Sequence, residues 1–309
     1  MNRKRCILII SLLLCFLGSL SLGAQQTKTA LTIYYTASLN GNLDGCDCKG
    51  QPRSGLVKTG VFLNERDRNT SVLFEAGDIL DVKPDDLLAA YILETYKELE
   101  YTLISLGDQE FSNGLEALAG YRDDYPLLCN NISFLSGNSA QPFSSGPRII
   151  ERNGVKLGVF ALLHPEVFYF YPKTITEAID LEPPREAAER LVGQLSSLGA
   201  DLIIGMFHGS LSFAEELAAE VDGIDVLLVG HEQRLVDAVM IEKTLIVSPG
   251  ENGNRVGVLD LEIRRGNILS YKNFFQTFDY KSAPDFPSVR KRIQDYYAQL
   301  VGRLREDPK

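Results

Sequence analysis

Four apolar segments of this chain end in a residue that can bind a metal, and this repeated pattern strongly constrains the fold. Asp78, Asp108, His208 and His231 close the segments 71–78, 101–108, 201–208 and 225–231. An apolar run that stops abruptly is typical of a buried parallel strand. Ligands of open α/β sheets bind beyond the carboxyl ends of such strands. The sequence therefore predicts that two acids and two imidazoles meet at one edge of a sheet.

Each of the four residues also has an ordinary explanation. Parallel strands often end in Gly-Asp, and a histidine can be a core residue with satisfied hydrogen bonds. The chain has only three histidines, however, and two of them stand at these strand ends. Imidazole suits Zn²⁺, Mn²⁺ or Fe²⁺ better than Ca²⁺ or Mg²⁺. We therefore expect a divalent metal cofactor, Zn, Mn or Fe, held by Asp78, Asp108, His208 and His231.

The composition indicates a globular protein and argues against nucleic acid as a partner. Hydrophobic residues make up 45% of the 309 residues and charged residues 23%, which is ordinary for a chain with a sizeable core. Beyond residue 24, 28 basic residues stand against 41 acidic ones. This negative balance repels nucleic acid and anionic membranes. An anionic substrate would therefore need help from a bound cation.

Residues 1–24 have the pattern of a secretory signal peptide. Basic residues at 3–5 precede an apolar run from Cys6 to Leu22, and Gly23-Ala24 offers a cleavage site. An uncleaved membrane anchor is the alternative. We expect a periplasmic or secreted protein, residues 25–309, with no stable membrane insertion after cleavage. Three cysteines, Cys46, Cys48 and Cys129, would then stand in an oxidising compartment.

The remaining pattern predicts one domain over residues 25–309. Asn153-Gly154 between two β-rich runs predicts a hairpin. Residues 141–146 are expected to form a loop, and the segments beyond Gly230 are expected to be antiparallel strands. Together these segments predict a layered α/β sandwich. The expected helices are 56–66, 84–100, 114–121, 183–198, 212–220 and a closing helix at 288–304.

The strand ends stand in an order that matches a known family. The blocks are Thr36-Ala-Ser38-Leu-Asn40-Gly41, Ala76-Gly-Asp78, Leu106-Gly-Asp108-Gln109-Glu110-Phe111, Phe207-His208-Gly209 and Gly230-His231-Glu232-Gln233. The chain resembles the catalytic domain of the 5′-nucleotidase branch of the calcineurin-like metallophosphoesterases, and the resemblance covers a core of about residues 30–280. The resemblance implies an α/β/β/α sandwich of mixed sheets flanked by helices. It also implies a hydrolase of phosphate esters that acts on a small phosphorylated molecule.

The departures from the family pattern divide between its two metal sites. Ser38, Asn40 and Gln233 stand where the family has the charged and imidazole ligands of one site, so that site is degenerate. The resemblance assigns the other site to the four residues named above, with Asp108 in place of an asparagine. Gln109 stands at the position of a catalytic histidine and cannot shuttle a proton. Position alone gives Asn40 and Gln109 the role of orienting substrate or water.

Cys46-Asp-Cys48 follows the first block and leaves three alternatives open. The pair could form a close disulfide, supply replacement metal ligands, or act as a redox-active dithiol. Cys129 is expected to be a buried apolar residue, and His164 a structural one. Arg53, Lys58 and Arg255 could hold a phosphate or could be ordinary solvated charges.

Two functions follow from these observations. The first is a secreted metal-dependent phosphoesterase-like hydrolase with one intact metal site. The alternative is a catalytically degenerate phosphoesterase fold that serves as a metal-binding or thiol-redox module through Cys46 and Cys48.

Overall fold

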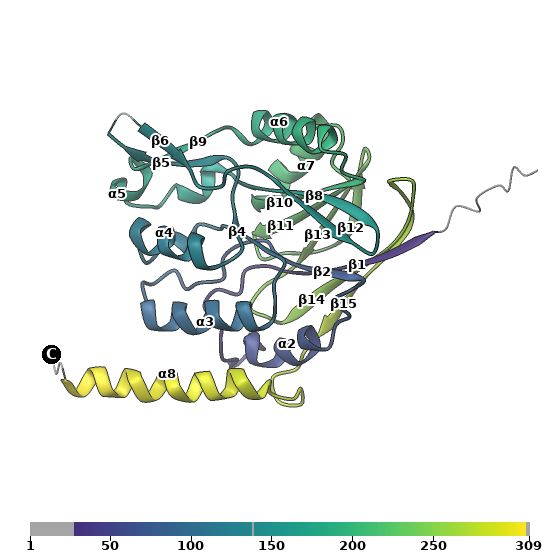
Figure 1. Cartoon of the computed structure of the whole chain (residues 1–309). Coiled ribbons are helices and arrows are strands. Elements are labelled where there is room, and N and C mark those ends of the chain that lie inside the picture. The colour runs from purple at the N-terminus through teal and green to yellow at the C-terminus, as the bar shows by residue number, and fades with distance from the viewer. Residues whose placement is uncertain (1–27, 138, 307–309) are drawn as a thin grey trace, which may run out of the picture.

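Two six-stranded sheets lie face to face, and helices cover their outer sides (Figure 1). The computed structural model describes residues 28–137 and 139–306, so the predicted signal peptide lies outside the described residues. Within the described ranges, no helix combines the length and the apolar character needed to cross a bilayer. The layered α/β/β/α architecture with mixed sheets confirms the predicted fold class.

The first sheet has the order β15-β14-β1-β2-β3-β4. Strands β1 to β4 run parallel, whereas β14 is antiparallel to β1 and β15 is antiparallel to β14. The strands are β1 (Thr29–Thr36), β2 (Ser71–Glu75), β3 (Leu103–Ser105), β4 (Leu127–Leu128), β14 (Arg255–Arg264) and β15 (Asn267–Thr277).

The second sheet has the order β12-β13-β11-β10-β8-β7. Its four central strands are parallel, and the antiparallel edge strand β7 joins β8 through the predicted hairpin at Asn153-Gly154. The strands are β7 (Arg148–Arg152), β8 (Val155–Leu163), β10 (Leu202–Gly209), β11 (Val226–His231), β12 (Leu235–Ile241) and β13 (Thr244–Pro249).

Alternation along the strands divides the core into three apolar layers. Val72 of β2 packs between the two sheets, whereas its neighbour Leu73 faces the helices of the first sheet. Those helices are α2 (Gly55–Asn64), α3 (Asp86–Glu98) and α8 (Pro287–Glu306), with α4 (Leu115–Asp124) beside them. The second sheet is covered by α6 (Pro184–Ser197) and α7 (Leu211–Glu220).

Two predictions about the strands were right only in part. Residues 141–146 were expected to form a loop, but 141 and 142 belong to β6 (Ser139–Pro142), which pairs with β5 (Ile132–Ser136). Strand β5 also pairs with β9 (Ile179–Leu181) in a small third sheet. The segments beyond Gly230 were expected to be antiparallel. Strand β12 pairs with β13 and β14 with β15 in this way, but β13 pairs parallel with β11. Neither pairing could be predicted, because no local sequence pattern identifies which strand a segment pairs with.

Short helical turns complete the described chain and border the strand ends. They are η1 (Gln109–Phe111), η2 (Pro165–Phe168) and α5 (Lys173–Thr176). Parallel strands of both sheets end at the same edge of the sandwich, where η1 and η2 lie. The fold therefore brings the four predicted ligand positions to one place.

Candidate metal centre

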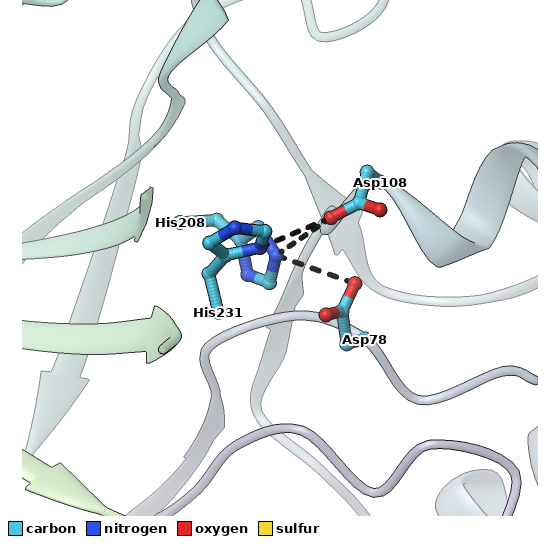
Figure 2. A group of neighbouring side chains, drawn as sticks. All are labelled: Asp78, Asp108, His208 and His231. Carbon is cyan, nitrogen blue, oxygen red and sulfur yellow. Dashed lines mark hydrogen bonds and ion pairs between the residues drawn. The ribbon is translucent and has the colours of Figure 1, made fainter. Parts of the chain in front are cut away.

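Asp78, Asp108, His208 and His231 converge at the seam between the two sheets. The acids follow β2 and β3 of the first sheet, and the histidines lie at the ends of β10 and β11 of the second. One potential ligand atom of each residue lies within 4.8 Å of the others. Figure 2 shows the four side chains pointing toward one another. This arrangement has the donor set of a transition-metal site.

The closest approaches within the group involve a single oxygen of each acid. His208 Nε2 lies 3.2 Å from Asp78 Oδ1 and 3.3 Å from Asp108 Oδ1. His231 Nδ1 lies 3.3 Å from the same Asp108 oxygen. Three of the four residues are buried, and the side chain of His231 is 33% exposed. The centre is thus enclosed on most sides and accessible past His231.

A backbone carbonyl orients His208 for ligation. Its Nδ1 lies 2.8 Å from the carbonyl oxygen of Ala76, which can only accept a hydrogen bond. The proton of the neutral ring therefore sits on Nδ1, and the lone pair of Nε2 faces the two carboxylates. Metal-binding histidines commonly donate their second N–H to a carbonyl in this way. The residues present therefore fit a divalent cation.

Three glycines leave room for this packing. A Cβ at Gly107 would lie 2.3 Å from Asp78 Oδ1, and one at Gly230 would lie 2.2 Å from the Ala76 oxygen. A Cβ at Gly77 would lie 2.5 Å from His208 Nδ1. The Gly-Asp and Gly-His pairs of the sequence therefore have a steric reason: only glycine allows the strand ends to approach so closely.

A buried carboxylate that the sequence analysis did not select ties the two acidic loops together. Glu110 accepts hydrogen bonds from the backbone N–H groups of Gly107, Asp78, Ile79 and Leu80 at 2.5–3.2 Å. Burial and then the negative charge of Asp78 raise the pKa of Glu110 to about 7. Its place two residues after Asp108 in the block 106–111 was the only signal that could have indicated this role.

The electrostatics of the centre favour a bound positive charge. Burial by itself raises the pKa of Asp108, but hydrogen bonds and charge from His208 and His231 outweigh burial and lower it. Burial likewise disfavours a charged His208, yet the carboxylates of Asp78 and Asp108 raise its pKa well above the ordinary value. Two acids that hold a proton on an imidazole in this way can hold a metal cation in its place.

Amide side chains fill the degenerate position beside Asp78. Gln109 Nε2 donates to Asp78 Oδ2 at 3.1 Å and to Asn40 Oδ1 at 2.9 Å. Asn40 Nδ2 in turn donates to the carbonyl of Ser38 at 2.8 Å and to Asn252 Oδ1 at 3.0 Å. The resemblance implies that two metals share the carboxylate of Asp78. In this structure its second oxygen, Oδ2, accepts a hydrogen bond from the Gln109 amide.

The backbone around the centre is held in the left-handed region at several non-glycine residues. His231 has the largest value, with φ at 86°, and Asp78 has φ at 62°. Such conformations are uncommon outside glycine, asparagine and aspartate, and they often cluster at functional sites. The other members are Ser38, Asn40, Gln233 and Asn252, with φ between 51° and 60°.

The cysteines lie outside the group that could hold a metal. Cys46 and Cys48 form a disulfide, and their loop is joined to Arg53 by an isolated antiparallel bridge. The described residues that converge on the centre include neither cysteine. Cys129 is free and buried, as expected. His164 stacks on Phe213 with ring centroids 3.8 Å apart and is separate from the group.

The aromatic segment after β8 forms one border of the centre. Tyr171 donates its hydroxyl to the carbonyl oxygen of Asp108 at 2.7 Å. Phe168 packs edge-on against Phe111, the residue that closes η1. These contacts link the segment between η2 and α5 to the loop that carries Asp108 and Gln109.

Comparison with characterised sequences identifies the group to which this chain is similar. No family model matches the chain. It is 24% identical over 287 residues to the trifunctional nucleotide phosphoesterase protein YfkN of Bacillus subtilis, which covers 77% of this chain and 20% of that protein. It is 29% identical over 252 residues to a 5′-nucleotidase of Diplobatis ommata, which covers 72% of this chain and 40% of that protein. The alignments with the first curated relatives span between a fifth and a half of their lengths.

Solved structures show the same fold. The calcineurin-like phosphoesterase YfkN from Bacillus subtilis superposes with a TM-score of 0.76 and 20% identity, over 90% of this chain and all of that one. The 5′-nucleotidase precursor from Thermus thermophilus has a TM-score of 0.74 and 19% identity, over 90% of this chain and 60% of that one.

The sequence relatives of this chain include nucleotide phosphoesterases and 5′-nucleotidases, and its structural neighbours include a calcineurin-like phosphoesterase, 5′-nucleotidases and a sulfate thiohydrolase. The resemblance stated from the sequence is thereby confirmed, and partial coverage of the relatives agrees with a match to their catalytic part. The sequence relatives are hydrolases of phosphate esters.

Proposed function

We propose that this protein is a metal-dependent phosphoesterase that uses one divalent cation, Zn, Mn or Fe, to hydrolyse a small phosphate ester. The observation that carries the proposal is the convergence of two buried carboxylates and two imidazoles within 4.8 Å of one another. The relatives are named as nucleotide phosphoesterases and nucleotidases, which supports nucleotides as the first substrates to test.

Asp78, Asp108, His208 and His231 would hold the cation. A bound divalent cation acts as a Lewis acid and lowers the pKa of a coordinated water toward about 7. The chain itself keeps the four side chains in place through the Ala76 carbonyl behind His208 and the Glu110 carboxylate behind the acidic loops. The opening beside His231 gives substrate a route to the centre.

Asn40 and Gln109 act as positioning residues in this proposal. Both side-chain N–H groups of Gln109 are used by Asp78 and Asn40, and both of Asn40 are used by Ser38 and Asn252. These amides therefore orient Asp78 rather than donate to substrate. Gln109 also donates to Asp78 Oδ2, the oxygen on the side where the family resemblance implies a second metal, and this supports a single cation.

We also propose that the protein works outside the cytoplasm, in the periplasm or as a secreted protein. The Cys46–Cys48 disulfide supports this location because disulfides persist in oxidising compartments. The signal-like pattern of residues 1–24 supports it from the sequence.

The test combines metal analysis with hydrolysis assays on the purified protein. We expect about one equivalent of metal and turnover of p-nitrophenyl phosphate or a nucleotide that follows the metal content. His208→Gln should lose both the metal and the turnover. His164→Gln is the matched control, because it changes the histidine that stacks on Phe213 outside the centre, and it should keep both. Two equivalents of metal, or full turnover in His208→Gln, would contradict the proposal.

A thiol-redox or metal-binding module without turnover is the second candidate. The disulfide at Cys46–Cys48, on an exposed loop, is the observation that favours it. This candidate predicts no phosphate-ester hydrolysis. It predicts a thiol-redox activity that depends on the oxidation state of the cysteine pair and persists in His208→Gln. The same set of variants therefore separates the two functions.

A further inference from the structure

A cleft of about 670 Å³ opens beside the metal centre. Gln233 and Asn252, which follow the ends of β11 and β13, stand on the side of the cleft nearest the centre. Arg53, Arg255 and Tyr280 are among the other residues that line it. Pockets of this volume are typical of small-molecule sites. The function proposed above does not use either arginine.

A chain of hydrogen bonds connects the cleft to the candidate metal ligand Asp78. Asn252 Oδ1 accepts from Asn40 Nδ2 and from Asn42 Nδ2, each at 3.0 Å. Asn40 is bonded to Gln109, and Gln109 to Asp78. Gln233 lies two residues beyond His231. A molecule bound at the centre could therefore extend into the cleft.

Arg53 and Arg255 lack an acidic partner in the described part of the chain, although Arg53 Nη1 donates a hydrogen bond to Asn42 Oδ1 at 3.3 Å. Among the residues that the structure describes, no carboxylate lies within 4.0 Å of either guanidinium group. Lys58, the third basic residue selected from the sequence, differs: it is buried and pairs with Asp285 at 2.6 Å. Two acids, Glu251 and Asp279, also line the cleft. Asp279 Oδ1 accepts the backbone N–H groups of Lys281 and Ser282. Arginine binds phosphate with two parallel hydrogen bonds.

Two backbone hydrogen bonds join Arg53 to Cys46, which the disulfide links to Cys48. Cys46 N–H donates to the Arg53 carbonyl at 2.8 Å, and Arg53 N–H donates to the Cys46 carbonyl at 3.0 Å. The next residue, Ser54, donates its N–H to Asn254 Oδ1 at 2.9 Å and its hydroxyl to the Phe278 carbonyl at 2.6 Å. The cysteine loop therefore forms one wall of the cleft, and the loop that follows β13 forms another.

We propose that this cleft binds a second phosphoryl group of the substrate through Arg53 and Arg255, with the Cys46–Cys48 disulfide positioning Arg53. The preferred substrates are then small molecules with two phosphoryl groups, such as a nucleoside diphosphate, of which the metal centre receives one. This inference rests on the proposed function for the reaction, but the binding that it describes does not require turnover.

The test measures binding of ADP to the chelator-treated protein by calorimetry, with adenosine as the comparison ligand. We expect ADP to bind without metal and adenosine to bind at least tenfold more weakly. Arg53→Ala and Arg255→Ala should each weaken ADP binding about tenfold or more, which is the size expected for a lost charged hydrogen bond. The Cys46→Ser/Cys48→Ser variant should weaken it in the same direction.

Arg234→Ala is the matched control. Arg234 carries the same charge one residue after Gln233, but it pairs with Glu232 at 3.6 Å and does not line the cleft. It should keep wild-type affinity for ADP. No ADP binding by the metal-free protein, or an equal loss in Arg234→Ala, would overturn the inference. Because ADP binding is measured here without metal and without turnover, whereas the proposed function is tested by metal content and hydrolysis, the two proposals fail separately.

Discussion

At the scale of single residues, the centre depends on the absence of a side chain as much as on its ligands. Gly107 is the sharpest case, because a Cβ there would lie 2.3 Å from Asp78 Oδ1 and 2.7 Å from His208 Cε1. Both of those atoms belong to candidate ligands, and neither can move without leaving the group. A one-atom change at this position should therefore act on the metal site specifically.

We expect Gly107→Ala to lower metal affinity at least tenfold while the protein remains folded, because displaced ligand support typically costs about 10- to 100-fold. Isothermal titration with Mn²⁺ and a circular dichroism melt check the two parts. Gly193→Ala is the control: this exposed glycine lies within α6, and a Cβ there meets no atom within 4 Å. Unchanged affinity in Gly107→Ala would show that the strand ends have more room than the structure indicates.

The buried side chain of Glu75 should make the stability of the protein depend on pH. It is fully buried at the end of β2, where Thr36 and Tyr96 donate their hydroxyls to one carboxyl oxygen at 2.6 and 2.9 Å. Burial raises the pKa of Glu75 to about 8. Between its unfolded pKa, about 4.3, and the folded value, the folded state keeps a proton that the unfolded state releases. The free energy of unfolding therefore falls as pH rises through this window.

Glu75→Gln removes this titration. The unfolding free energy of wild type should fall from about pH 5 to about pH 8, whereas that of the variant should not fall for this reason. The difference between the two proteins should therefore change by about 2–4 kcal/mol in favour of the variant, since one pKa unit corresponds to about 1.4 kcal/mol. Urea denaturation of both proteins at the two pH values measures the difference. A constant offset between the proteins at both pH values would contradict the raised pKa.

At the scale of elements, Glu110 joins the loops that follow β2 and β3. Four backbone N–H groups, of Gly107, Asp78, Ile79 and Leu80, converge on its carboxylate. A buried donor that loses its acceptor costs more than an exposed one, because it has no water to replace the bond. The loops that position both acidic ligands thus depend on a residue that is not itself a ligand.

Glu110→Gln should lower the free energy of unfolding by about 2–4 kcal/mol, because the amide nitrogen replaces one accepting oxygen and faces backbone donors. Urea denaturation measures the loss. Glu116→Gln makes the same chemical change on the exposed first turn of α4 and should stay within about 0.5 kcal/mol of wild type. Equal stability of the two variants would mean that the loops are held by other contacts.

The same scale shows how far the sequence could predict this structure. The apolar runs predicted β2, β10 and β11, and their last residues predicted the four converging side chains, because parallel strands share one edge for their carboxyl ends. The pairing of β13 and the small sheet around β5 were missed because partners distant in the chain leave no periodic signal. Glu110 was not selected because its role consists of hydrogen bonds that exist only after folding.

At the scale of the whole molecule, the candidate ligands join the two halves of the sandwich. The acids belong to the first sheet and the histidines to the second, so a cation bound here would add to the interface between the sheets. Its binding free energy would then stabilise the entire fold rather than one loop.

Removal of metal should therefore lower the melting temperature of the whole protein. At a free metal concentration of about 100 Kd, binding contributes about 2.7 kcal/mol, which corresponds to a shift of roughly 4–5 °C for a chain of this size. Scanning calorimetry with Mn²⁺ and with a chelator measures the shift as a single transition. His208→Gln should show no shift, and an equal shift in that variant would place the stabilising ion elsewhere.

The left-handed residues at positions 38, 40 and 233 have a consequence for the substitutions that this protein can accept. Such backbone conformations admit short polar side chains far more readily than β-branched ones. Few residue types can therefore occupy these three positions without backbone strain, and serine and the amides are among them. Valine or isoleucine at any of the three should distort the loops that border the centre.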